Sequence, residues 1–164
     1  MKKLYLIRHA KSSWSNANLN DFDRPLNKRG HSNAPEMAQR LVDNDISFDL
    51  IVSSPANRAK TTAQYFLATL NLSPKQLTFN ESIYEAGFGN LVSIIQSISN
   101  KVNSLALFGH NPTFTGFANK LCGTNIANVP TCGIVAIGIE TTDWAKFYEA
   151  EAKLLFFDFP KNVV

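Results

Sequence analysis

The sequence predicts an α/β protein, a three-layer αβα sandwich around a mostly parallel sheet of roughly six strands. Short apolar segments alternate with segments of helical periodicity along the 164 residues, an order typical of α/β folds. Several apolar segments are nearly continuous, as in parallel strands that are buried on both faces. No repeat, low-complexity tract or linker divides the chain, so we expect a single domain over residues 1–164.

Six segments have the length and composition of strands. The first, second and fourth are nearly continuous apolar runs, the pattern of central strands. The expected strands are Lys3–Ile7, Asp49–Ser53, Gln76–Phe79, Ser104–Phe108, Gly133–Ile139 and Ala152–Phe159.

Helices are expected between these strands. Pro55–Leu70 follows Ser54, and a serine before a proline is a helix-start signal. Pro112–Leu121 also begins at a proline. For Asn33–Asp43 we expect Ser32 or Asn33 as the cap, with its proline in the first turn.

The last two helical segments differ in the strength of their pattern. Asn90–Lys101 places four apolar residues on one face at helical spacing, so this face is expected in the core. Thr141–Glu149 is expected to form only a short helical turn before the final strand.

Composition restricts the class of protein and of partner. Apolar residues make up 45% and charged residues 18%, which are the proportions of an ordinary globular protein. A net charge of +3 is too small to indicate a nucleic-acid partner, but it suits a target that carries phosphate or carboxylate. No segment approaches the roughly 20 apolar residues that cross a bilayer. We therefore expect no membrane partner, a cytoplasmic location and, for Cys122 and Cys132, buried thiols and not a disulfide.

Basic and imidazole side chains follow three of the predicted strands. Arg8 and His9 follow the first strand, Arg58 lies in the first turn after the second, and His110 follows the fourth. Ligands of open α/β sheets bind beyond the carboxyl ends of the strands. The sequence therefore predicts that these four side chains converge at one edge of the sheet.

The chemistry of these residues favours a phosphoryl group. Guanidinium groups match the geometry of phosphate oxygens, a neutral imidazole can attack phosphorus, and a second, cationic imidazole can stabilise the equatorial oxygens. Such a scheme needs neither a metal nor another cofactor. Neither Cys122 nor Cys132 is followed six residues later by the arginine of a cysteine phosphatase. No phosphate-binding Gly-x-x-x-x-Gly-Lys loop is present, and two separated histidines are a poor zinc site.

Five motifs in order resemble the histidine phosphatase superfamily, whose fold is phosphoglycerate mutase-like. They are LIRHAKSSW, RPLNKRG, SSPANRAKTT, IYEAGFGNL and LFGHNPTFTGFAN, and the ending AKLLFFDFPKNV also fits. The sequence is most similar to the SixA-type phosphohistidine phosphatase branch.

The resemblance implies a role for each matching residue. His9 would be the nucleophile that becomes phosphorylated, and Arg8, Arg58 and His110 would form the phosphate pocket. Glu85 corresponds to the general acid that some members of the family use.

Further residues are candidate phosphate ligands on weaker grounds. Lys11, Ser15 and Arg24 lie in or near the matching motifs, and Arg24 alternatively pairs with Asp21 or Asp23. The glycine that usually follows Arg-His is an alanine here. The resemblance implies a phosphorylated protein as substrate, with phosphohistidine on a phosphotransfer domain favoured. A small-molecule phosphomonoesterase and a non-catalytic phosphate-binding module stay open as alternatives.

Overall fold

Six strands form one sheet in the computed structural model, which describes residues 1–163. Their order across the sheet is β3-β2-β4-β1-β5-β6, and β5 pairs antiparallel with both β1 and β6 while the other pairs are parallel. Each expected strand is confirmed to within one residue at either end. The bounds are β1 Lys2–Arg8, β2 Leu50–Ser53, β3 Leu77–Phe79, β4 Ser104–Gly109, β5 Ile134–Ile139 and β6 Ala152–Asp158.

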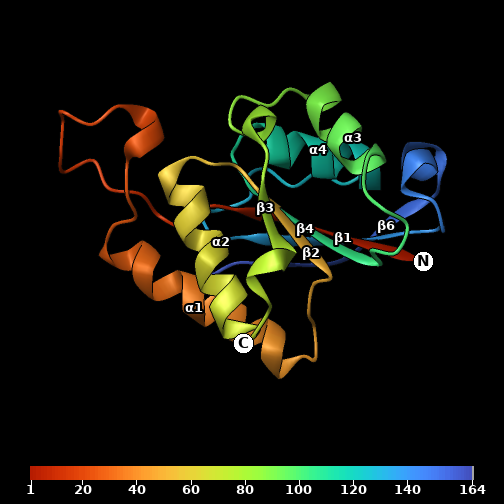
Figure 1. Cartoon of the computed structure of the whole chain (residues 1–164), viewed down its shortest axis with the longest axis horizontal. Helices are drawn as coiled ribbons and strands as arrows, with labels where there is room; N and C mark the ends of the chain where they lie inside the picture. The colour runs from red at the N-terminus through yellow and green to blue at the C-terminus, as the bar shows by residue number, and fades with distance from the viewer. Residues whose placement is uncertain (164) are drawn as a thin grey trace.

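Helices cover both faces of this sheet, so the three-layer αβα architecture is confirmed (Figure 1). Helices α1 (Lys28–Asp43) and α2 (Asn57–Thr69) pack on one face, where Met37 and Phe66 are completely buried. Helices α3 (Phe88–Gln96) and α4 (Thr113–Cys122) pack on the other face, with a 3₁₀ helix at Trp144–Glu149. This 3₁₀ helix confirms the short helical turn expected before the last strand.

The predicted start of the first helix was wrong. Helix α1 begins at Lys28 because the Asn27 side chain caps it, accepting a hydrogen bond from the Gly30 N–H at 2.9 Å. The Asn27 N–H in turn donates to the Lys11 carbonyl, a contact between segments far apart in sequence. Pro35 therefore lies inside the helix and not in its first turn.

The predicted end of the third helix was also wrong. Helix α3 ends at Gln96, and the Ser97 hydroxyl donates to the Ile94 carbonyl at 2.7 Å. The buried Lys2 ammonium donates to the carbonyls of Asn100 and Val102 at 2.7 and 2.8 Å, which holds the following segment as a turn. Helices α2 and α4 agree with the expected ranges to within two residues.

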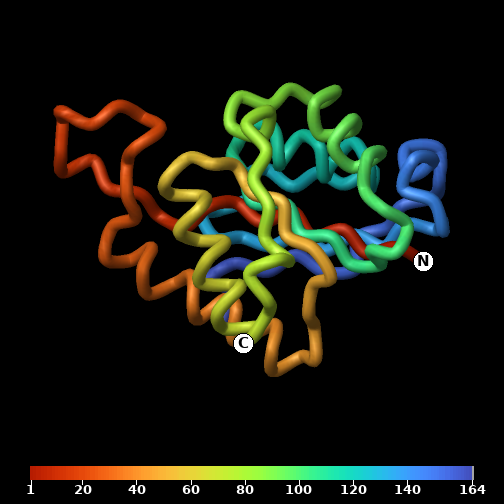
Figure 2. Tube along the Cα trace, in the orientation of Figure 1, coloured from red at the N-terminus to blue at the C-terminus, as the bar shows by residue number. Residues whose placement is uncertain are grey.

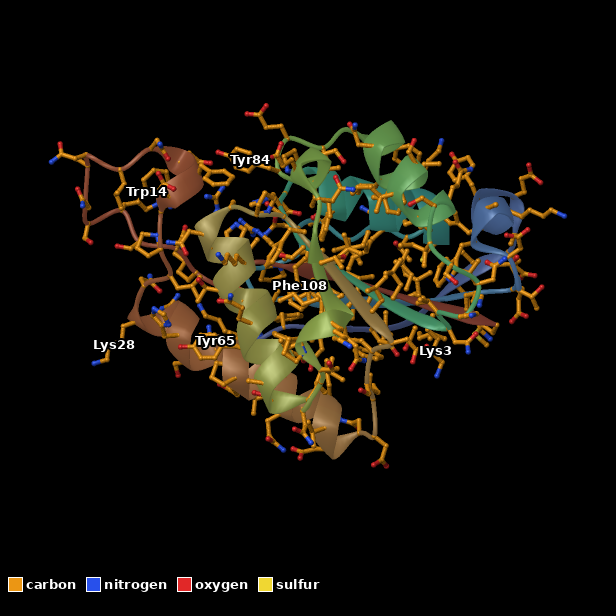
Figure 3. The ribbon with its side chains drawn as sticks, in the orientation of Figure 1. Lys3, Trp14, Lys28, Tyr65, Tyr84 and Phe108 are labelled. Carbon is orange, nitrogen blue, oxygen red and sulfur yellow. The ribbon has the colours of Figure 1, made fainter. Side chains whose placement is uncertain are left out.

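The chain between β1 and α1 projects from the carboxyl edge of the sheet (Figure 2). It carries a 3₁₀ helix at Asp21–Asp23, capped by Asn20, whose side chain accepts from the Asp23 N–H at 3.0 Å. Trp14 lies in this projecting segment (Figure 3) and is largely exposed.

Both cysteines are free thiols, as expected, but only Cys132 is fully buried; Cys122 is half-buried at the end of α4. Within residues 1–163, no helix has the length and apolar character that crossing a membrane requires.

Candidate active site

The four side chains expected to converge do so at the carboxyl edge of the central strands. Arg8 ends β1 directly opposite Gly109, the last residue of β4, and His9 and His110 follow them. The His9 N–H donates to the Gly109 carbonyl at 3.0 Å, which fixes the two strand ends side by side. The centroids of the two imidazole rings are consequently only 5.3 Å apart.

His9 is buried, with 8% of its surface exposed, and has one ring nitrogen free to react. Its Nδ1 lies 2.7 Å from the Ala10 carbonyl oxygen. Because a carbonyl oxygen can only accept, Nδ1 carries the ring proton and Nε2 keeps its lone pair. Burial lowers the pKa of His9 to about 3, and the positive charges of Arg58 and Arg8 act in the same direction. The imidazole is therefore neutral at physiological pH, as a nucleophile must be.

His110 is held by the hydroxyl of Ser54, which lies 2.8 Å from its Nε2. That hydroxyl also accepts from the Ala56 N–H at 3.2 Å. The other ring nitrogen of His110, Nδ1, is buried without a partner in the described chain. Burial, then Arg58, lowers the pKa of His110 to about 4. The free protein therefore has a neutral second imidazole, in contrast to the cation that the sequence suggested.

The two arginines concentrate positive charge beside these rings. Arg8 donates from Nη1 to the Val129 carbonyl at 3.0 Å, and its Nε is buried without a partner in the described chain. Burial and the charge of Arg58 lower the pKa of Arg8 from its ordinary value. Unpaired buried donors and adjacent guanidiniums are the features expected of an anion site.

Arg58 comes from the first turn of α2 and is only 7% exposed. Its Nη1 donates to the Asp21 carbonyl at 2.7 Å and its Nη2 to Asp21 Oδ2 at 2.9 Å. Asp21 Oδ2 also accepts from the Tyr84 hydroxyl at 2.6 Å, and the Tyr84 ring lies edge-on to His110 with centroids 5.6 Å apart.

The other expected site residues are not all placed beside the two histidines and two arginines. Glu85 is exposed and lines a cavity of about 290 Å³ together with Tyr84 and His110. Lys11 is exposed, and the exposed Ser15 hydroxyl bonds to that of Ser13.

Arg24 is buried and has all three guanidinium nitrogens engaged within the projecting segment. They donate to the Ser13 carbonyl, the Ser12 hydroxyl and Asp21 Oδ1, and the guanidinium lies 3.2 Å from the ring centroid of Trp14. Of the two alternatives for its ion pair, the structure has Asp21.

Sequence reasoning missed the residues that support the site. Thr62 accepts from the Ala10 N–H at 3.0 Å and donates to the Arg58 carbonyl at 2.7 Å, so it joins the end of β1 to α2. Ser54 was noticed only as a helix-start signal, and Tyr84 only as part of a motif. No local pattern identifies such residues, because their partners are distant in the sequence.

This arrangement can bind a tetrahedral anion and present one neutral nitrogen to it. Guanidiniums and an imidazole N–H would contact the oxygens, and His9 Nε2 would face the central atom. Among residues 1–163, no three His, Cys, Asp or Glu side chains group as metal ligands.

Comparisons with known proteins agree with this chemistry. The family model of the histidine phosphatase superfamily (branch 1) matches residues 4–141. The structure resembles that of an Agrobacterium tumefaciens protein that bears the name phosphohistidine phosphatase SixA. Its TM-score is 0.83, with 27% identity, and the likeness covers 97% of this chain and 98% of that one.

Two curated relatives extend the comparison. An uncharacterized chloroplastic protein of Arabidopsis thaliana is 30% identical over 90% of this chain and 71% of its own length. A 2,3-bisphosphoglycerate-dependent phosphoglycerate mutase of Bartonella tribocorum is 30% identical over 55% of this chain and 45% of its own length. The chain therefore belongs to the histidine phosphatase superfamily and is a phosphatase of that superfamily.

Proposed function

We propose that this phosphatase removes phosphate from phosphohistidine on a phosphotransfer protein, by way of a phosphohistidine on His9. The observation that carries the proposal is a neutral imidazole, free at Nε2, beside two guanidiniums and a second imidazole. A nitrogen nucleophile of this kind makes and breaks a P–N bond without needing a metal ion.

The reaction then has two balanced steps. His9 Nε2 attacks phosphorus, the P–N bond of the substrate breaks, and the departing imidazole takes up a proton. Water next attacks the phosphorus on His9, which releases inorganic phosphate and restores the free imidazole. Arg8, Arg58 and the His110 imidazole stabilise the oxygens in both steps, since their charges and dipoles are already oriented.

Two features support a protein as the substrate. The imidazole of a phosphohistidine leaves readily once protonated, so the reaction does not depend on a strong general acid. The likeness to the Agrobacterium tumefaciens protein that bears the name phosphohistidine phosphatase SixA covers 97% of this chain and 98% of that one.

The covalent step is tested by trapping. The protein is incubated with a ³²P-labelled phosphohistidine protein and quenched, and the adduct is expected to be labile in acid and stable in base. His9→Ala should abolish it, whereas His31→Ala, a change to an exposed histidine on α1, should retain it. An adduct that persists in His9→Ala would contradict the proposal, as would hydrolysis that EDTA abolishes.

A second substrate class is favoured by the position of Glu85. Glu85 lines the same cavity as His110, and a carboxyl group there would protonate the poor leaving group of a phosphate ester. Glu85→Gln is therefore compared on a phosphohistidine protein and on a sugar phosphate. We expect a loss of about 10²-fold or more confined to the ester if Glu85 is an acid, and little change on phosphohistidine. If the wild type and Glu85→Gln were equally active on each of the two substrates, Glu85 would have no part in the mechanism.

A further inference from the structure

Asp21 places a negative charge against a site that attracts anions. Its carbonyl and carboxylate occupy both terminal nitrogens of Arg58, at 2.7 and 2.9 Å. The carboxylate would compete electrostatically with a phosphoryl group for the same guanidinium. The contact between Asp21 and Arg58 therefore weakens anion binding. Its role must be something other than raising the affinity for phosphate.

Asp21 is held firmly in this position. Its Oδ2 accepts from Tyr84, and its Oδ1 pairs with Arg24 at 3.1 Å. The neighbouring Asp23 carbonyl accepts from the Asn57 side chain at 3.1 Å, which ties the 3₁₀ helix to the start of α2. The contact between Asp21 and Arg58 is therefore part of a network of hydrogen bonds and ion pairs.

Asp21 is unsuited to donate a proton. Hydrogen bonding from Tyr84, followed by the hydrogen bond and charge of Arg58, lowers the pKa of Asp21 to about 2. Its carboxylate is ionised throughout the physiological range. An ionised carboxylate can neither protonate a leaving group nor bind a phosphoryl oxygen.

The contacts with Arg58 leave donors for the substrate. A guanidinium has five N–H groups, and Asp21 engages two of those on Arg58. N–H groups that do not bond to Asp21 can meet phosphoryl oxygens while Asp21 keeps the plane of the guanidinium fixed. Orientation in advance raises the rate of a positioned reaction more than it raises binding.

We propose that Asp21 is a positioning residue that fixes the Arg58 guanidinium for phosphoryl transfer and, by its charge, weakens retention of the product phosphate. This inference rests on the proposed function of the pocket. It separates two effects of one side chain, since orientation depends on its hydrogen bonds and retention on its charge.

Two variants separate the effects. Asp21→Asn keeps an oxygen acceptor but removes the charge, so phosphate should bind about fivefold more tightly, with kcat near that of the wild type or limited by release. Asp21→Ala removes both, and kcat should fall about tenfold or more while phosphate binding still tightens. Asp23→Asn, in the same 3₁₀ helix with an exposed side chain, is the matched control and should change neither quantity.

The affinity for phosphate is measured by calorimetry, which needs no turnover. The values of kcat and KM are measured with a phosphohistidine protein as the substrate. If neither affinity nor kcat changes in the two Asp21 variants, and only the melting temperature falls, Asp21 is structural and the inference is overturned. If the wild type itself binds no phosphate and forms no adduct, the proposed function fails instead. The two failures are therefore distinguishable.

Discussion

A single hydrogen bond fixes the tautomer of the His9 imidazole. The Ala10 carbonyl accepts from Nδ1, so the tautomer with a free Nε2 is selected before any substrate arrives. The arginine and histidine at the end of β1 were identifiable from the sequence, since both lie at a predicted strand end. The bond to Ala10 was not, because it depends on the backbone conformation after the strand.

The lowered pKa values of the histidines make folding stability depend on pH. An unfolded histidine has a pKa near 6.5, but His9 in the folded protein has a pKa of about 3 and His110 of about 4. Between these values and 6.5 the unfolded chain binds more protons. The free energy of unfolding should therefore fall as the pH is lowered from 7 toward 4.

Urea unfolding at pH 7 and pH 5 measures this effect. His9→Gln should lose less stability than the wild type over the same interval, because one of the two groups no longer titrates. His31→Gln, a surface change, serves as the control. An identical pH dependence in His9→Gln and the wild type would contradict the assignment.

At the scale of elements, Thr62 joins α2 to the end of β1. It is completely buried and bonds to the Ala10 N–H and the Arg58 carbonyl. Thr62→Val keeps the shape but leaves the Ala10 N–H without a partner, which should cost about 1–3 kcal/mol of unfolding free energy. Because the same residue supports both His9 and Arg58, kcat should also fall.

Thr61→Val is the matched control, since Thr61 lies on the same helix and its hydroxyl donates to the Asn57 side chain. Urea denaturation and turnover of both variants give the comparison. A Thr62→Val protein as stable and active as the control would show that the tie between α2 and β1 is unimportant.

Strands were predicted better than helix ends, for a physical reason. The apolar run of a buried strand identifies the strand directly. Helix α1 begins earlier than predicted because Asn27, and not Ser32 or Asn33, is its N-cap. After α3, Lys2 of β1 donates to the carbonyls of Asn100 and Val102, and such a contact between distant segments leaves no local pattern.

At the scale of the whole molecule, the sequence predicted which residues of the candidate site lie together but not what surrounds them. The alternation of strands and helices placed Arg8, His9, Arg58 and His110 at one edge. Asp21 was noticed only as a candidate partner of Arg24, and its contact with Arg58 joins segments 37 residues apart. The three-dimensional arrangement alone brings that carboxylate to the pocket.

The accessibility of the two thiols to a reagent tests whether the whole chain is packed as the structure shows. Cys132 is fully buried, and burial raises the pKa of its thiol, while Cys122 is half-buried. A thiol reagent should therefore label one cysteine per native chain, at Cys122, and two in denaturant. Mass spectrometry after labelling, with Cys122→Ser as the control, identifies the position. Rapid labelling of Cys132 in the native protein would contradict the burial of its thiol.

The free Nε2 of His9 also fixes the stereochemistry at phosphorus. If every phosphoryl group passes through this one nitrogen, each turnover contains two in-line displacements, and each displacement inverts the configuration. A substrate made chiral with oxygen isotopes should then give its phosphoryl group to an acceptor alcohol with overall retention. Inversion would mean that the acceptor attacks the substrate directly and that the imidazole never carries the group.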